Sequence, residues 1–314
     1  MSASHDDHDH SDAGQPRVEE VADGIFAYVQ PDGSWWVNNA GFVGGRRMTL
    51  VVDTCATERR TRALLETVRH VTGRPPTTVV NTHHHGDHTN GNGLLAGATI
   101  VGHTRCRQAM ADTGILRPDG LWEPVAWGEL ELAPPFVTFD DRLDVWVDDT
   151  KVELHHLGPA AHTTNDVVAY VPDHKVLFTG DLVFNGGTPF VLMGSVTGSL
   201  AVLDRLAAFD ADVVVPGHGA PCTLDQVEPV AEYLRFVRRV AEEGRAAGLA
   251  PLDAARACDL GPFAELTDRE RIVGNLHRAY AELDGAEPGA PIDVVTALVD
   301  MVAYNGGAPL RCLA

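Results

Sequence analysis

A run of metal-competent side chains, "HHHGDH" at residues 83–88, constrains the fold more than any other feature of the sequence. It directly follows the apolar segment "TTVVNT", and it is denser in imidazole than a surface loop needs to be for polarity alone. Side chains of the same chemistry, His162, Asp181 and His218, follow three later strand-like segments. Loops converge at strand ends in layered α/β folds while the sheet keeps them rigid. The sequence therefore predicts an α/β (α+β) fold in which four strand ends meet.

The remaining pattern agrees with this fold class. Short β-like runs rich in Val, Ile and aromatic residues alternate with helical segments such as 56–71, where apolar residues fall on one face. Residues 115–135 contain four prolines and are expected to be irregular, and the chain becomes helical after about residue 223. The predicted organisation is a disordered, acidic and histidine-rich tail (1–17), a catalytic domain (18–222) and a helical C-terminal extension packed on it (223–314).

Composition limits the partners that this chain can have. Its 24 Lys and Arg against 44 Asp and Glu give a net charge of −20, which argues against nucleic acid because that affinity comes mainly from basic side chains. No apolar run is long enough for a transmembrane helix, and the N-terminus lacks the features of a signal peptide. The five cysteines are scattered and form no C-x-x-C spacing. We expect a cytoplasmic protein acting on a small molecule, with no membrane or nucleic-acid partner.

The spacing within "HHHGDH" suits two metal ions rather than one. Side chains alternate along an extended segment, so His83 and His85 point to the same side and can grip one ion. Gly86 allows the chain to turn, after which Asp87 and His88 can face a second ion. Nitrogen and oxygen ligands without thiolate favour zinc, with iron or manganese as alternatives. A carboxylate elsewhere, such as Asp181, can bridge two ions through its two oxygens.

Four segments together resemble the metallo-β-lactamase superfamily of metallo-hydrolases: "HHHGDH" (83–88), "GPAAHTTND" (158–166), "LFTGD" (177–181) and "VVPGHG" (214–219). The earlier strand "LVVDT" fits as well, so the resemblance covers roughly residues 18–222. It implies an αββα sandwich with a dinuclear metal site at one edge. The implied first ion is held by His83, His85 and His162, the second by Asp87, His88 and His218, with Asp181 bridging and Asp53 orienting ligands from behind through hydrogen bonds. His84 matches no position of the pattern.

The implied chemistry is hydrolytic or Lewis-acid catalysis. Two ions a few Å apart lower the pKa of a shared water and stabilise negative charge on a substrate oxygen. Asp87 is expected to hold the proton of the nucleophile as well as bind metal, and loss of Asp87 or His218 is expected to abolish turnover.

Differences between this sequence and related branches of the superfamily exclude several classes of substrate. The best-known β-lactam-degrading subclass carries Cys where this chain has Asp181, and the diiron flavoprotein branch generally places Glu where this chain has His85. RNA-processing members share the ligands, but the net charge of −20 makes RNA a poor substrate. The substrate classes that remain are thioesters, lactones and similar acyl compounds.

Two segments are expected to wall the substrate pocket. Residues 30–41 should form a hairpin beside the metals, and residues 182–200 are apolar and glycine-rich. Their aromatic and thioether side chains suit a flat, apolar substrate, although ordinary core packing explains such residues equally well. The predicted pocket residues are Trp35, Trp36, Asn38, Phe184, Phe190 and Met193.

Three longer segments resemble a narrower group, the metallo-β-lactamase-fold cyclases of aromatic (type II) polyketide biosynthesis, including the actinorhodin-pathway type. They are "VADGIFAYVQPDGSWWVNNAG", "GDLVFNGGTPFVLMGSVTGSL" and "NLHRAYAELDG" with the later "MVAYNGG". The resemblance implies aldol ring closure and dehydration of a carrier-bound polyketide, with thioesterase activity, as part of antibiotic biosynthesis. An acyl carrier protein would then be a partner and would need a basic patch, for which the candidates are Arg46 with Arg47, or Arg235, Arg238 and Arg239.

Two other interpretations stay open. One is a glyoxalase II-like or lactonase-like hydrolase of small thioesters or esters. The other is a noncatalytic scaffold, which the complete set of seven ligands disfavours because a scaffold has no need of them. The sequence leaves open whether the chain forms a homo-oligomer.

Overall fold

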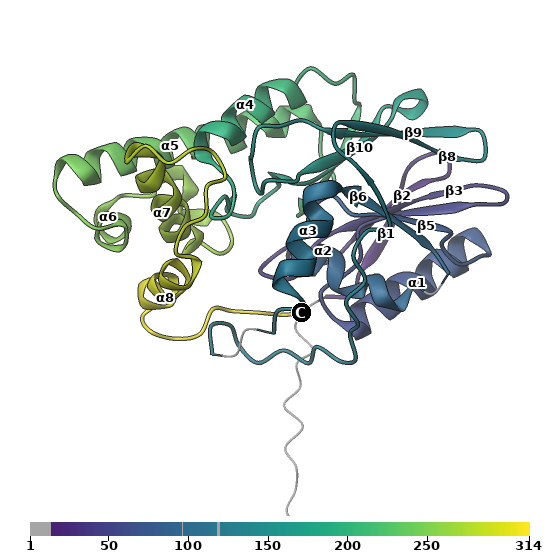
Figure 1. Ribbon diagram of the computed structural model, residues 1–314, viewed down its shortest axis with the longest axis horizontal. Helices are drawn as coiled ribbons and strands as arrows, with labels where there is room; N and C mark the ends of the chain where they lie inside the picture. Colours follow the sequence, from purple (N-terminus) through teal and green to yellow (C-terminus); the bar gives the residue numbers. More distant parts are fainter. Residues whose placement is uncertain (1–13, 96, 118–119) are drawn as a thin grey trace, which may run out of the picture.

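The computed structural model describes residues 14–95, 97–117 and 120–314. Most of the predicted acidic tail, residues 1–13, therefore lies outside the described part of the chain. The described residues form two β-sheets with helices on both sides, as Figure 1 shows.

The first sheet has seven strands in sequence order. Its first four strands pair antiparallel and the last four pair parallel, with β4 belonging to both groups. The strands are β1 (Arg17–Ala22), β2 (Ile25–Val29), β3 (Ala40–Gly44), β4 (Thr49–Val52), β5 (Thr78–Val80), β6 (Thr99–His103) and β7 (Val137–Phe139). Strand β5 is buried along its whole length and delivers the histidine loop at its carboxyl end.

The second sheet has five strands in the order β12-β11-β10-β9-β8. Only β11 and β12 pair in parallel, so their carboxyl ends lie at the same edge. The strands are β8 (Arg142–Val147), β9 (Thr150–His156), β10 (Val167–Val171), β11 (Val176–Phe184) and β12 (Val213–His218). Strand β11 continues through Asp181 to Phe184, beyond the end expected from the sequence, because its pairing with β12 continues to Phe184 and His218.

One hydrophobic core lies between the two sheets. Val52 and Val80 of the first sheet share it with Leu154 and Phe178 of the second. A Cβ atom at Gly41 would lie 2.1 Å from the Phe178 ring, so glycine is required where β3 packs against this ring of the second sheet.

Helices cover the outer faces and complete the predicted αββα sandwich. The helix α1 begins after Thr57, whose side chain accepts a hydrogen bond from the Arg60 backbone, and ends at Gly73 in the left-handed conformation. In Figure 1, α1 lies below the strands and α4 above them. The helices up to this point are α1 (Glu58–Thr72), α2 (Gly86–Thr89), α3 (Thr104–Thr113) and α4 (Val196–Leu206).

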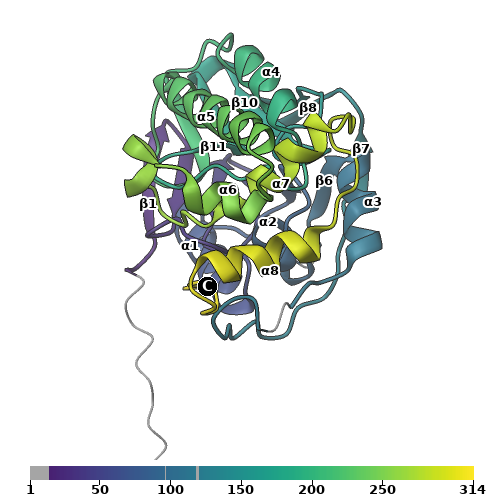
Figure 2. The ribbon, with the colours of Figure 1, turned by 90° about the vertical axis from the view of Figure 1, so that its left-hand side faces the viewer.

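The C-terminal part of the chain is helical, as predicted. It contains α5 (Val227–Ala246), α6 (Pro251–Ala257), α7 (Arg271–Leu283) and α8 (Val294–Tyr304), which Figure 2 shows together at one end of the molecule. Apolar residues of α5 and α7 share a core with β11 and α4. Among the described residues, no helix is both long and apolar enough to span a membrane.

Candidate metal centre

The seven predicted ligands come from four places that the two sheets bring together. His83, His85, Asp87 and His88 lie in and after the loop that follows β5, and His88 belongs to the short helix α2. The other three are His162, in the loop between β9 and β10, Asp181 within β11, and His218 at the end of β12. Six of the seven side chains belong to buried residues, and His85 is partly exposed.

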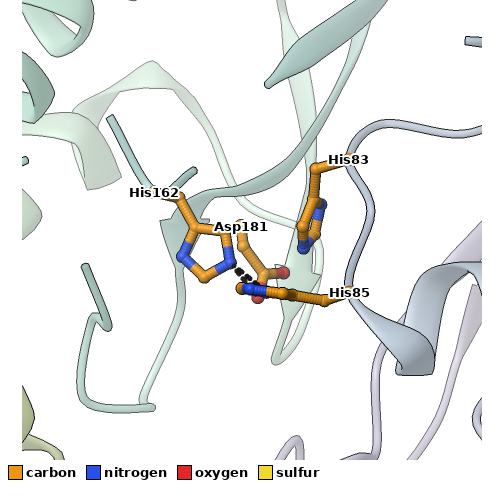
Figure 3. Close-up of side chains that lie close together, drawn as sticks. All are labelled: His83, His85, His162 and Asp181. Atoms are coloured by element: carbon orange, nitrogen blue, oxygen red, sulfur yellow. Dashed lines mark hydrogen bonds and ion pairs between the residues drawn. The ribbon is translucent and has the colours of Figure 1, made fainter. Parts of the chain in front are cut away.

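These residues form two groups that share one carboxylate. In each group, one ligand atom of every residue lies within 4.8 Å of the others. The first group is His83, His85, His162 and Asp181, whose side chains point toward one another in Figure 3. The second group is Asp87, His88, Asp181 and His218. The membership is the one that the sequence implies, and the role of each residue as a metal ligand stays a prediction.

Hydrogen bonds to the far side of three rings turn the other nitrogen of each ring toward the centre. The Nδ1 atoms of His83, His162 and His218 face Thr82 Oγ1, the Phe190 carbonyl and the Gly33 carbonyl. Such partners fix the ring orientation of histidines that bind metals. The described residues offer no hydrogen-bond partner to four buried atoms of the centre: the Nε2 atoms of His83, His85 and His88, and Asp181 Oδ1. The His88 Nε2 and Asp181 Oδ1 atoms are 3.1 Å apart, but not in hydrogen-bond geometry.

Asp53 contacts the second group from outside the cluster of ligand atoms. Its Oδ2 atom is 2.8 Å from His88 Nδ1, and both carboxylate oxygens accept hydrogen bonds from Thr82, one from the backbone and one from the hydroxyl. Asp53 adopts a left-handed backbone with φ of 62°, an uncommon conformation for a residue other than glycine. The carboxylate therefore connects the end of β4 to the orientation of His88.

The two groups differ in the direction in which their surroundings shift the histidine pKa values. Burial, reinforced by neighbouring imidazoles, lowers the pKa of His83 and His85 well below the usual value, so both rings are neutral and keep a lone pair for a metal. Burial by itself also lowers the pKa of His218, but Asp181 and Asp87 outweigh it and raise that pKa to about 9. A site that attracts a proton this strongly also attracts a cation. The donor chemistry therefore fits a dinuclear metal centre.

A cavity of about 190 Å³ opens beside the centre. Five of the predicted pocket residues line it: Trp35, Trp36, Phe184, Phe190 and Met193. Residues from both metal groups line it as well, including His85, Asp87 and Asp181. The rings also pack on one another, with the Trp35 and Phe190 centroids 5.0 Å apart. The same side chains therefore line the cavity and belong to the hydrophobic core.

Asn38 is the predicted pocket residue that the structure does not bring to this cavity. Its side chain is fully buried and donates hydrogen bonds to the carbonyls of Asn39 and Thr54. It therefore supports the loop that carries Trp35 and Trp36, and its polar group faces the backbone instead of the substrate space.

The cavity also has walls that the sequence did not identify. Trp122 comes from the irregular segment 115–135, whereas Arg271 and Leu298 come from α7 and α8 of the C-terminal extension. His84, which matches no position of the sequence pattern, lines the cavity too. The two tryptophans in the segment 115–135 could have indicated that this segment lines the cavity. The contribution of α7 and α8 could not have been predicted, because the pattern of an amphipathic helix does not show which of its turns contacts a distant loop.

Comparison with known proteins identifies the family. The model of the metallo-beta-lactamase superfamily matches residues 33–218, more than half of the chain. The chain belongs to the metallo-β-lactamase superfamily. A metallo-β-lactamase from Pontibacter korlensis has the same fold, with a TM-score of 0.60 at 20% identity over 70% of this chain and 99% of that structure.

The curated relatives carry three different activities in their names. A 2,4-dinitroanisole O-demethylase alpha subunit from Nocardioides is 26% identical over 94% of this chain and 80% of its own length. A linear primary-alkylsulfatase from Pseudomonas is 27% identical over 60% of this chain, and a hydroxyacylglutathione hydrolase from Methylococcus capsulatus is 30% identical over 44%. The matches span only 42% and 45% of the latter two proteins. Together with the two His/Asp groups, they support a metallo-hydrolase-type function and leave the substrate open.

Proposed function

We propose that this protein is a dinuclear zinc enzyme that cyclises an aromatic polyketide by aldol condensation and dehydration, and that it also cleaves the acyl thioester. The observation that carries the proposal is the junction of the metal centre with an aromatic cavity. The cavity is walled by Trp35, Trp36, Trp122, Phe184 and Phe190, and it is partly built by the C-terminal helices. The sequence resemblance to polyketide cyclases extends over those same helices.

The charge of the wall favours an uncharged, flat substrate. Among the described residues that line the cavity, Arg271 is the one that carries a guanidinium or ammonium group. Its Nη2 atom lies 2.7 Å from the Asp268 carboxylate, and its guanidinium lies over the Trp35 ring at 4.1 Å from the centroid. The cation is therefore already paired and stacked, and it adds little attraction for an anionic substrate such as a glutathione conjugate.

The residues of the centre have separable roles in this reaction. Two divalent ions held by the two groups would supply Lewis acidity that activates water and stabilises negative charge on a substrate oxygen. Asp87 both belongs to the second group and lines the cavity, so its carboxylate is placed to accept the proton released from a water molecule or a substrate carbon. His88 and His218 hold the pKa of Asp87 below its usual value although burial alone would raise it. The carboxylate is thus ionised, as a proton acceptor must be.

The two candidate basic patches do not support a docking surface for an acyl carrier protein. Arg46 and Arg47 pair with Asp149 and Asp148 on the surface. In the second patch, Arg235 pairs with Glu228 and Arg238 lies 3.9 Å from Glu242. These cations are balanced by neighbouring acids, so the proposal concerns the acyl substrate and assigns no carrier surface.

A hydrolase of small thioesters or esters is the second candidate. The name of the hydroxyacylglutathione hydrolase relative, which is 30% identical over 44% of this chain, favours it. The metal centre serves this chemistry equally well, and the apolar cavity would then bind the acyl or alcohol portion.

Turnover assays with different substrates distinguish the two candidate functions. Zinc-loaded protein should convert an N-acetylcysteamine thioester of a bicyclic polyketide to a cyclised product, followed by mass spectrometry. Replacing Asp87→Asn should lower the rate at least about a hundredfold, the usual contribution of a general base. Asp173→Ala, at an exposed position, is the matched control, and metal content is measured for both variants. Turnover of lactoylglutathione or dodecyl sulfate without any polyketide product would establish the second candidate instead.

A further inference from the structure

His84, the middle histidine of the metal-binding loop, has no role in either metal group. It lies between His83 and His85 in the chain, yet none of its atoms belongs to the two clusters of ligand atoms. Its ring is tilted against the His85 ring, with the centroids 4.8 Å apart, and the residue lines the cavity beside Trp36 and Asp87. The ring is thus adjacent to the metal centre and in contact with the space that a substrate would occupy.

Asn165 fixes which nitrogen of His84 carries the proton. The side-chain nitrogen of Asn165 lies 3.1 Å from His84 Nδ1, and an amide nitrogen can only donate. With the Asn165 amide in this orientation, Nδ1 accepts, and the ring proton of the neutral imidazole is on Nε2. Asn165 is fully buried, and its backbone N–H donates to the Thr163 hydroxyl, which in turn donates to Asp166. The backbone of Asn165 is therefore held by the turn that also presents His162, and the side-chain Oδ1 has no hydrogen-bond partner among the described residues.

The Nε2–H of His84 is available to a ligand. This atom has no hydrogen-bond partner among the described residues, and it is not one of the buried atoms that lack a partner. The half-buried ring therefore has its free donor at accessible surface, and the residue itself lines the cavity. The cavity wall includes the apolar side chains of Trp36, Met110 and Leu132, and a hydrogen-bond donor beside such groups favours ligands that can accept over those that cannot.

We propose that His84 Nε2–H donates a hydrogen bond to a keto or acyl oxygen of the substrate, and that Asn165 is the positioning residue that keeps this nitrogen protonated. The inference rests on the proposed function only in taking this cavity as the substrate site. It makes His84 a specificity-determining residue for oxygenated ring systems, with no contribution to metal binding.

A matched pair of probes tests the donor without any need for turnover. The zinc-loaded full chain is titrated with 1-tetralone, a bicyclic ketone, and with tetralin, the hydrocarbon that lacks the oxygen. Binding is followed by the fluorescence of the tryptophans that line the cavity. The wild type should prefer the ketone. His84→Leu should weaken ketone binding about three- to tenfold, the effect of one neutral hydrogen bond, and leave tetralin binding unchanged.

Three controls distinguish the donor from a structural role. His84→Gln keeps a side-chain N–H and should retain most of the ketone preference, whereas Asn165→Leu, which frees the tautomer, should lose part of it. All variants should keep the zinc content of the wild type. Equal losses for both probes in His84→Leu, unchanged ketone binding in that variant, or no ketone preference in the wild type would overturn the proposal. If the wild type failed to cyclise a polyketide, the proposed function would be wrong, but the comparison of 1-tetralone and tetralin binding would still test the role of His84.

Discussion

At the scale of single residues, the candidate metal centre depends on residues that belong to neither of its two groups. Asp53 is the clearest case, because its carboxylate contacts both His88 Nδ1 and Thr82. Gly217 is another, because the absence of a side chain there leaves room for Asp181. Ligand orientation in this centre is therefore set by neighbours whose replacement should change metal affinity before it changes the fold.

Replacing Asp53→Asn should weaken metal binding by the second group about ten- to hundredfold, the usual cost of losing such a supporting contact. Asn tolerates the left-handed backbone found here, so the fold should persist. Metal retained per chain after dialysis against graded chelator measures the effect, with Asp23→Asn at an exposed position as control. Retention equal to that of the wild type would show that Asp53 does not orient His88.

Replacing Gly217→Ala should reduce metal content below two ions per chain. A Cβ atom at this position would lie 1.9 Å from Asp181 Oδ1, so the shared carboxylate must move. Gly187→Ala is the matched control, because the nearest atom to its added Cβ is 3.5 Å away, an ordinary contact. Elemental analysis of both purified variants gives the comparison, and full metal content in Gly217→Ala would contradict the role of Asp181 in both groups.

The sequence identified the residues of the centre better than those of the cavity. His83 and His85 have a spacing with a direct geometric meaning, since alternation along an extended segment decides which side chains point together. Asn38 shows the limit of this reasoning, because a polar residue next to aromatic ones can face its own backbone. The tautomer of His84 could not be predicted at all, since it depends on a contact with a residue 81 positions away.

At the scale of elements, α7 organises the cavity wall. The Asn275 side chain accepts a hydrogen bond from the Val191 backbone and donates to the Pro189 carbonyl and the Tyr233 hydroxyl. These bonds hold the loop after β11, which includes Phe190, against α5 and α7. The helices were predictable from their apolar periodicity, but their contacts with this loop were not, because periodicity gives the buried face of a helix and not its partner.

Replacing Asn275→Ala should lower the free energy of unfolding by about 1–3 kcal/mol, because it leaves buried backbone groups unpaired. Urea unfolding of the zinc-loaded protein measures this cost. Asn305→Ala, which removes exposed hydrogen bonds after α8, should stay within about 0.5 kcal/mol of the wild type. Similar stability of the two variants would mean that α7 does not hold the loop through Asn275.

At the scale of the whole molecule, the C-terminal helices and the family region share one core. Leu177 and Val183 of β11 pack in the same cluster as Leu234 of α5 and Leu276 of α7. The alternation of strands and helices predicted an α/β fold, and the resemblance to the metallo-β-lactamase superfamily implied the αββα sandwich. The contribution of the extension to the cavity was not predictable, since it arises only when α7 and α8 meet loops of the sandwich.

A chain that ends at residue 222 should therefore fail to fold. Removing residues 223–314 would expose the apolar outer face of the second sheet and of α4, and such a surface favours aggregation. Solubility and the cooperativity of thermal unfolding by circular dichroism measure the outcome. A soluble fragment with a cooperative transition would instead make the extension a separable unit.

The central claim is that two groups sharing Asp181 hold two metal ions beside an aromatic cavity. Anomalous diffraction at the zinc absorption edge, from crystals of the zinc-loaded full chain, tests it most directly. Our account predicts two peaks per chain, one among His83, His85 and His162, the other among Asp87, His88 and His218, with Asp181 between them. A single peak, no peak, or zinc bound only elsewhere on the chain would contradict it.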